Sequence, residues 1–451
     1  MPTTKKTPGV YIEEITFFPP AIASVDTAVP AFIGYTDKDD YKFQAKKIRS
    51  LLEYEEFFSV DEWKLTFTEN ENRIDEDFSR NQLYYNMQLY FANGGGKCYI
   101  ISLGKKPRNN DGNKQDFLDA LDLLAKEDEP TLIVMPEAIQ LDKADCMDVY
   151  KAALAQAANL MDRFVIMDIP ESDDEDDDEI EDFRNGIGTN NLKFGAAYYP
   201  FLNTTISKYA LVNDSDILFE KSTVEDVGGV KTKSVTKSDI ESGHLERQKL
   251  IAQIKAETLV LPPSAAIAGV YCSVDATRGV WKAPANISLN FVSSCAKKIT
   301  NEEQEELNIH TEGGKSINAI RAFTGQGVVV WGARTLAGND NEWRYINVRR
   351  FYNFVEESVK KATQQFVFEP NDANTWVRVS TMIENFLINL WRQGALAGAT
   401  PQDAFFVKVG LDITITRDDI LNGIMNVEIG LAVTRPAEFI ILRFSQKMQE
   451  S

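Results

Sequence analysis

Histidine is almost missing from this chain, since only His244 and His310 occur among 451 residues. A serine-protease triad needs a histidine as its general base, and a histidine-rich metal site needs several imidazoles. His244 falls in a polar stretch and His310 in a polar loop, and neither lies in a motif of that kind. The sequence therefore argues against both kinds of site.

Cysteine is also scarce. Cys98, Cys146, Cys272 and Cys295 lie far apart and form no C-x-x-C pair. We expect buried free thiols in a reducing cytoplasm.

Long apolar runs are missing as well. No stretch approaches the ~18 apolar residues of a membrane span, and Met1–Tyr11 carries two lysines with no apolar run behind them. We therefore expect neither a membrane span nor a secretory leader.

Basic residues fall short of acidic ones, with 48 Lys and Arg against 68 Asp and Glu, for a net charge of −20. Nucleic-acid phosphates would repel such a chain, so no nucleic-acid partner is expected. The charge suits a particle that stays soluble at high copy number. It is uneven, because residues 341–451 carry 12 basic and 13 acidic residues. We expect this near-neutral part to pack against copies of itself while the acidic part faces water.

Length and hydrophobic patterning predict several domains and an α/β body. A chain of 451 residues with 43% apolar content is expected to form two or three domains with buried cores. Helical spacing alternates with short apolar runs, which predicts a parallel sheet covered on both faces. The expected strands are Ala28–Thr36, Cys98–Leu103, Thr131–Met135 and Phe164–Ile169, and the expected helices are Leu83–Phe91, Phe117–Leu124 and Ala144–Met161.

Two polar stretches interrupt this pattern. Glu171–Asp182 has ten acidic residues in twelve, which is compatible with a metal or polycation site. Calcium loops need spaced ligands and a glycine turn that are missing here, so a solvated surface loop is the preferred interpretation. Asn203–Thr258 is polar and irregular, with one helix expected over Asp239–Ala256.

Residues 341–451 show the clearest periodicity. Apolar residues at helical spacing predict two amphipathic helices, and strict alternation predicts two strands behind them. The helices are centred on Val348–Val359 and Trp376–Trp391, with Gly394 ending the second; the strands are Phe406–Ile415 and Ile424–Val433, with a turn at Asn422-Gly423, and a last strand is Glu438–Phe444.

Both chain termini carry a strand without a local partner. Pro8–Ile15 predicts a short strand that Pro19-Pro20 separates from the body. The two C-terminal strands on two helices leave both sheet edges open, which is a hazard unless another strand pairs with them. The terminal strands are therefore expected to pair with something distant, in this chain or another.

Long ungapped words of this sequence resemble the contractile tail sheath proteins of myophage tails, R-type pyocins and phage-tail-like extracellular injection particles. The resemblance is carried mainly by Trp331–Phe351, Thr375–Trp391 and Gly394–Val409. Further matching words are Pro8–Thr36, Tyr198-Tyr199-Pro200, Leu261–Asn286 and Ser316–Arg321.

The resemblance implies a structural subunit with no catalytic activity, cofactor or metal. Such a subunit polymerises as a helical stack of hexameric rings around an inner tube and contracts to drive the tube through a target cell envelope. The implied partners are copies of itself, the inner tube protein, baseplate and tail terminator proteins and paralogous sheath proteins, with no membrane in the resting state. Such particles assemble in the bacterial cytoplasm and become a virion tail or a released phage-tail-like particle.

The resemblance also divides the chain, which is α/β in its body and α+β as a whole. The expected parts are an N-terminal linking arm (1–27), an α/β sheath body (28–202 and 261–340), a polar surface insertion (203–260) and a C-terminal helix-and-sheet lattice domain (341–451). Strands of neighbouring subunits are expected to complete that lattice domain. The residues implied in assembly are the intersubunit strands Val10, Tyr11, Ile12, Phe439, Ile440, Ile441 and Leu442, the lattice sheet Val407, Val409, Val427 and Ile429, and the tube or neighbour contacts Arg344, Arg349 and Arg350.

An α/β hydrolase-like or nucleotide-binding enzyme is the alternative. Gly314-Lys315-Ser316 lacks the glycine that a phosphate loop has five residues earlier, where Ile309 stands. Gly94-Gly95-Gly96-Lys97 is followed by Cys98 rather than Ser or Thr. We interpret both as turns. The sheath body is often compared with the subtilisin fold, but this sequence offers no histidine base for a protease.

Overall fold

The computed structural model describes residues 21–58, 65–68, 82–106, 112–171, 178–207, 217–227, 230–237, 252, 256–311, 313–439 and 441–442. The strand predicted over Pro8–Ile15, most of the helix predicted over Asp239–Ala256, and His244 lie outside these ranges. The chain divides into a body unit, residues 26–356 with 435–451, and a small unit, residues 1–25 with 357–434. The division falls within helix α9 (Ile346–Thr363).

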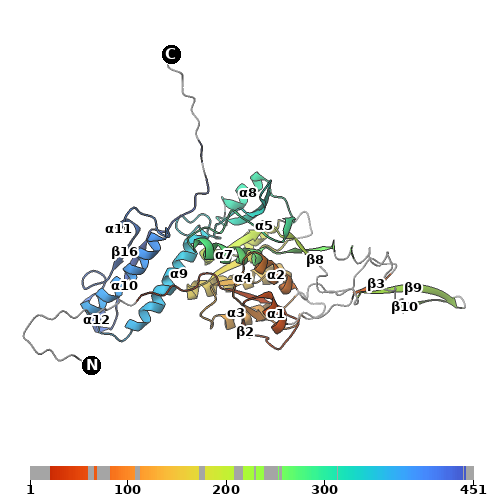
Figure 1. Cartoon of the computed structure of the whole chain (residues 1–451), viewed down its shortest axis with the longest axis horizontal. Coiled ribbons are helices and arrows are strands. Elements are labelled where there is room, and N and C mark those ends of the chain that lie inside the picture. The colour runs from red at the N-terminus through yellow and green to blue at the C-terminus, as the bar shows by residue number, and fades with distance from the viewer. Residues whose placement is uncertain are drawn as a thin grey trace, which may run out of the picture. The chain divides into compact units, whose positions relative to one another are not determined.

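The body unit is built on a nine-stranded sheet with a parallel centre (Figure 1). Its order is β12-β15-β14-β7-β6-β5-β1-β4-β2. Neighbours from β14 to β4 pair in parallel, and the outer pairings with β2, β15 and β12 are antiparallel. The strands are β1 (Pro30–Gly34), β2 (Ala45–Ile48), β4 (Cys98–Ser102), β5 (Leu132–Val134), β6 (Phe164–Asp168), β7 (Gly195–Tyr199), β12 (Ile287–Ser288), β14 (Ile317–Phe323) and β15 (Gly327–Val330).

Helices cover both faces of this sheet, as the unbroken apolar runs predict. One core is formed with α1 (Leu51–Phe58), α2 (Gln82–Ala92) and α7 (Ser264–Arg278). The core on the other face involves α3 (Lys114–Leu124), α4 (Lys143–Leu160), α5 (Glu179–Gly186), α8 (Asn301–Asn308) and the short helices η2 (Ala138–Gln140) and η3 (Leu192–Phe194). The predicted α/β body is thus confirmed, and it is doubly wound. Within the described ranges, no helix combines the length and apolarity that a membrane crossing demands.

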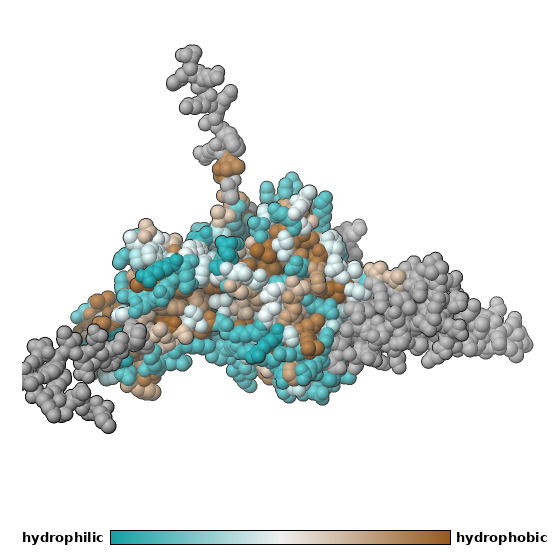
Figure 2. Space-filling view, viewed as in Figure 1, coloured by the Kyte–Doolittle hydropathy of each residue, from teal (hydrophilic) through white to brown (hydrophobic). Residues whose placement is uncertain are grey.

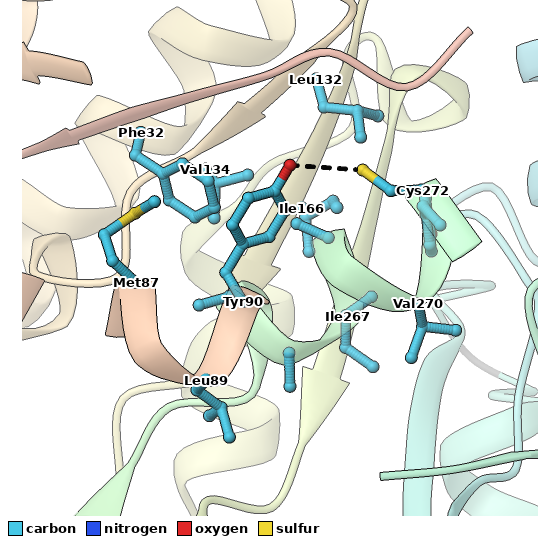
Figure 3. Packing of buried hydrophobic residues seen from close by; sticks show 14 of the residues in the cluster. Phe32, Met87, Leu89, Tyr90, Leu132, Val134, Ile166, Ile267, Val270 and Cys272 are labelled. Carbon is cyan, nitrogen blue, oxygen red and sulfur yellow. Dashed lines mark hydrogen bonds between the residues drawn. The ribbon is translucent and has the colours of Figure 1, made fainter. Parts of the chain in front are cut away.

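The core beneath α2 and α7 is tightly packed (Figure 3). Phe32, Val134 and Ile166 from three strands meet Tyr90 of α2 and Cys272 of α7, whose Oη and Sγ atoms lie 3.5 Å apart. A Cβ atom on Gly269 of α7 would lie 2.5 Å from the Tyr90 carbonyl oxygen. The two helices therefore approach one another at a distance that only glycine allows.

Two three-stranded sheets occupy much of the stretch that the sequence analysis treated as irregular. Strand β8 (Leu202–Ser207) lies between β11 (Thr258–Leu261) and β13 (Val292–Cys295), and β9 (Ile217–Val227) lies between β10 (Val230–Lys237) and β3 (Leu65–Thr68). The irregular interpretation of Asn203–Thr258 was therefore wrong. Lys231 stands opposite Asp226 and Lys237 opposite Glu220 in the β9–β10 register. Oppositely charged residues in such cross-strand positions are compatible with strand pairing. They also weaken the apolar pattern from which a strand is predicted.

The small unit contains the second predicted helix, α10 (Ala373–Arg392). Asp372 caps it by accepting a hydrogen bond from the Thr375 amide at 3.0 Å, and Gly394 follows it with a φ of 83°. The predicted apolar face is buried, including Val379, Ile383 and Leu387. The remaining elements are η5 (Gln364–Phe366), α11 (Pro401–Ala404), β16 (Phe405–Lys408), α12 (Arg417–Leu421) and β17 (Glu428–Leu431).

The two strands of the small unit are shorter than their alternation predicts. After β16 the chain turns, with Asp412 at a φ of 61°, and Thr416 and Asp419 form a capping box that begins α12. A Thr-x-x-Asp box starts a helix because it satisfies free amide groups at the N-terminus, and here it overrides the alternation. The described residues of the predicted C-terminal strand, Glu438, Phe439, Ile441 and Leu442, are not in a strand of this single chain.

Candidate functional site

The strand order reverses between β1 and β5, and doubly wound enzymes bind ligands at such a point. Strand β1 leads to β4 on one side, whereas β5 leads to β6 and β7 on the other. Beyond the carboxyl ends of β1 and β5 stands Glu137, which is 1% exposed. One of its carboxyl oxygens accepts the Tyr35 amide at 2.5 Å, and the other accepts the Leu83 amide at 3.0 Å.

Glu137 thereby fills the place of a ligand. Leu83 lies in the first turn of α2, where free amides would otherwise attract a phosphate. A Cβ on Gly34 would lie 2.6 Å from the nearer Glu137 oxygen, so the group fits closely against β1. Burial raises the pKa of Glu137 to about 8, against the lowering effect of its amide donors and of Lys106. The crevice is closed by the protein's own side chain.

Lys97 and Lys315, from the two short sequences that resemble phosphate loops, both bind other groups of the chain. Lys315 is buried and donates to the carbonyl oxygen of Arg184, while Ser316 donates to that of Asn308 at 2.5 Å. Lys97 pairs with Asp26 at 2.5 Å and with Glu129 at 3.0 Å. These geometries agree with the interpretation of both words as turns.

Titratable clusters do not assemble into a metal centre in the described part of the chain. His310 receives the Gly313 amide on Nδ1 at 3.0 Å, and its Nε2 lies 3.5 Å from Glu181. A pocket beside α4 and α5, lined by Lys143, Met147, Pro170, Glu179, Asp182 and Phe183, has a volume of about 20 Å³. That is room for about one water molecule.

Two of the three arginines predicted to touch a tube or neighbour are buried in the body unit. Arg350 binds both oxygens of Asp275, at 3.1 and 2.6 Å, and the Thr27 carbonyl at 3.0 Å. Arg349 binds Asn353 at 2.7 Å and Glu356 at 2.8 Å and lies against aromatic rings. Their guanidinium groups are bonded within the chain, and their predicted contact with a tube or neighbour stays a prediction. Arg344 is partly exposed and donates to the Asp340 carbonyl at 3.1 Å, and its predicted contact likewise stays a prediction.

The predicted lattice sheet is present as a pair of strands. Val407 stands directly opposite Ile429, whereas Val409 follows β16 and Val427 precedes β17. All four side chains are half-buried. In the described part of the small unit no third strand lies beside β16 or β17, so each keeps an edge that can receive a strand.

The C-terminal segment, residues 435–442, carries the most exposed apolar side chains near a chain end. Phe439, Ile441 and Leu442 are 69%, 77% and 72% exposed, and Figure 2 shows apolar side chains of this segment with open space around them. Glu438, just before them, binds Arg334. Ile440 and the N-terminal residues Val10, Tyr11 and Ile12 lie outside the described residues, so their predicted linking role stays a prediction.

Sequence reasoning missed Glu137 and Glu438. No pattern reveals Glu137, because its partners stand 102 and 54 residues away. A signal for Glu438 exists in hindsight: it is the one charged residue within the run Ala437–Leu442.

The sequence is similar to tail sheath proteins in its C-terminal part. Residues 338–447 match the family model of the phage tail sheath C-terminal domain. Tail sheath proteins of Vibrio phage KVP40 and Burkholderia phage BcepMu are 25% and 29% identical over 136 and 142 residues, which is 30% of this chain in each case. The matched regions span only 20% and 29% of those two relatives.

Solved structures match over nearly the whole length. The sheath complex of an extracellular contractile injection system, PVC, in its contracted state is 31% identical, with a TM-score of 0.68 and 99% of both chains covered. The helical sheath of the anti-feeding prophage AFP, also contracted, is 34% identical, with a TM-score of 0.67 and coverage of 98% of this chain and all of that one. On this evidence the chain belongs to the contractile tail sheath protein family.

Proposed function

We propose that this chain is a structural subunit of a contractile sheath, which polymerises as a helical stack of hexameric rings around an inner tube. Contraction of the sheath drives the tube through a target cell envelope. The observation that carries this proposal is the match over 99% of both chains to a contracted injection-system sheath. Its partners are further copies of itself, the tube protein, and baseplate, terminator and paralogous sheath proteins.

Two features support polymerisation by strand exchange. The β16–β17 pair has edges that can accept a strand, and the C-terminal segment presents exposed apolar residues. Added strands gain backbone hydrogen bonds of about 1 kcal/mol each, while alternate side chains fix the register. In this proposal Val10–Ile12 and Phe439–Leu442 pair with sheets of neighbouring subunits. The residues that receive them are Val407, Val409, Val427 and Ile429, and Arg344 contacts the tube or a neighbour.

Contraction then needs no nucleotide. Glu137 fills the crevice where a doubly wound fold would take a phosphate, and Lys97 and Lys315 are bound within the chain. The energy is therefore stored in an extended lattice that a trigger releases, and an activation barrier sets the lifetime of that loaded state.

An α/β hydrolase-like or nucleotide-binding enzyme is the less supported alternative. Such an enzyme needs polar groups that converge on an open pocket. Three candidate groups in the described part of the chain, Glu137, Lys97 and Lys315, are engaged in internal hydrogen bonds or ion pairs.

Electron microscopy of the native particle tests the proposal. We expect tubes with six-fold helical order that contain this chain, and irreversible shortening in mild acid or urea after all nucleotide has been removed. Discrete globular particles without helical order would refute the structural role. A strict need for nucleotide hydrolysis during shortening would refute the mechanism.

A further inference from the structure

Glu438 ties the C-terminal segment to Arg334 of the body unit, just before the exposed apolar residues of that segment. Glu438 accepts hydrogen bonds from Nε and Nη2 of Arg334 at 2.9 and 2.5 Å, so that both carboxylate oxygens are engaged. The Tyr345 hydroxyl donates to the same carboxylate at 3.3 Å. A bidentate pair of this kind is among the strongest and most directional polar contacts in proteins.

Arg334 is itself held rigidly by the body unit. Its side chain is 3% exposed, and Nη1 donates to the Asn308 carbonyl at 3.2 Å. Its amide donates to the Asn318 side chain at 2.8 Å, and that side chain donates back to the Arg334 carbonyl at 2.8 Å. Asn318 belongs to β14 of the large sheet. These hydrogen bonds fix the position of the Arg334 guanidinium group, so that it offers Glu438 a rigid binding site.

The described residues after Glu438, which are Phe439, Ile441 and Leu442, are exposed. The side chain of Glu438 is 17% exposed, whereas the next side chain, that of Phe439, is 69% exposed. The segment therefore has a fixed root and an end whose side chains face solvent.

We propose that the Arg334–Glu438 pair is the anchor that positions the C-terminal linking strand, setting the point at which it leaves the body and so the neighbouring copy that it reaches. This inference rests on the proposed sheath function. Glu438 is a positioning residue, because the residues that touch the neighbour follow it. An anchor also ensures that tension on the strand is transmitted to the large sheet through Arg334.

Loss of Glu438 should affect assembly more than folding. A buried arginine left without its partner would normally cost several kcal/mol. Here the partner lies on a terminal segment, so release of that segment admits water to Arg334 and removes most of this penalty. The subunit stays folded while the strand loses its fixed starting point.

The test compares full-length Glu438→Gln, Glu438→Ala and Glu438→Asp subunits with wild type. Glu342→Gln is the matched control, because Glu342 is an exposed carboxylate near Tyr345 whose loss removes the same charge. Each subunit is produced together with the other particle components, and sheath length and number are scored by electron microscopy. The urea midpoint of the isolated subunit is measured in parallel.

We expect Glu438→Gln and Glu438→Ala to lower sheath yield by about tenfold or more, on the order of the effect of losing one strong contact per subunit, at an unchanged urea midpoint. Glu438→Asp should recover much of the yield, because the carboxylate remains and the terminal segment can shift to meet Arg334. Normal sheaths from Glu438→Ala, no recovery with Glu438→Asp, or an unfolded Glu438→Gln subunit would each overturn the anchor. Failure of the wild type to form sheaths would instead contradict the proposed function.

Discussion

The buried ion pair between Arg350 and Asp275 allows a quantitative test of how the first half of α9 is fixed in the body unit. The two side chains are 2% and 4% exposed, and both carboxylate oxygens are bound. Arg350 also lies 4.5 Å from the centre of the Tyr271 ring and donates to the Thr27 carbonyl. The guanidinium group thus ties α9 to α7 and to the segment that precedes β1.

Removing one partner should be far more costly than removing both. Asp275→Asn leaves a buried guanidinium without a counter-charge, which costs about 3–5 kcal/mol of unfolding free energy. The Arg350→Met/Asp275→Leu double variant buries no charge. It loses the bond to Thr27, about 1 kcal/mol, and the contact with Tyr271, about 1–2 kcal/mol. We therefore expect the double variant to be more stable than Asp275→Asn.

Equilibrium urea unfolding of the purified full-length subunit, followed by circular dichroism, measures these differences. Wild type, Arg350→Met, Asp275→Leu and the double variant form a cycle whose coupling energy isolates the pair. Asp182→Asn is the control, because it removes a carboxylate that pairs with Lys143 at 2.8 Å while both side chains are 50% exposed; its effect should stay below about 1 kcal/mol. Single-variant losses that simply add up in the double variant would refute the reasoning, as would a loss below about 1 kcal/mol for Asp275→Asn.

Two further predictions concern the body unit. Gly269→Ala should lower the unfolding free energy by about 1–3 kcal/mol, because the added Cβ would meet the Tyr90 carbonyl at 2.5 Å, whereas Gly96→Ala, with nothing within 4 Å, should leave the urea midpoint unchanged or slightly raised; equal midpoints for the two variants would contradict the close approach of α2 and α7. Glu129 is partly buried, which raises its pKa, but hydrogen bonds from Lys47, Tyr99 and Lys97 outweigh burial and lower that pKa from 4.5 to about 2. A lowered pKa means that the stabilisation is present above pH 4.5 and is lost as the pH falls towards 2. The unfolding free energy of Glu129→Gln should therefore depend less on pH between pH 5 and 3 than that of the wild type. The difference should be only about 1 kcal/mol because the site is 31% exposed. An unchanged pH profile in that variant would show that this cluster adds nothing.

The parts of the fold that were predictable from the sequence are those in which local pattern and burial agree. The apolar runs around Ile133 and Ile166 are short and bounded by proline, which predicts strands buried on both faces, and α10 carries its apolar stripe, its cap Asp372 and Gly394 in the expected order. Strands β9 and β10 escaped notice because charged and other polar residues interrupt their apolar ones. The end of β16 was misjudged because alternation continued past the point where a capping box took over.

The candidate site was less accessible to sequence reasoning for a different reason. The partners of Arg349 and Arg350 could not be named from the sequence, since nothing local reveals that Asp275 or Trp343 will enclose them. The sequence predicted a spare C-terminal strand, and the exposure of Phe439 and Ile441 in the single chain fits that prediction without testing its pairing. The anchor at Arg334 depends on a contact across 104 residues. Contacts of that range are not encoded in any local pattern.

The filled crevice at Glu137 has a consequence for the thermodynamics of any assembly built from this chain. A ligand that binds only the folded state raises stability in proportion to RT ln(1 + [L]/Kd), which makes that stability depend on the surrounding concentration. Here the group at the N-terminus of α2 is covalently part of the chain, so its effective concentration never changes. The stability that this crevice contributes is the same in a phosphate-rich interior and in dilute surroundings. A particle that leaves one environment and acts in another retains this part of its stability without carrying a ligand with it.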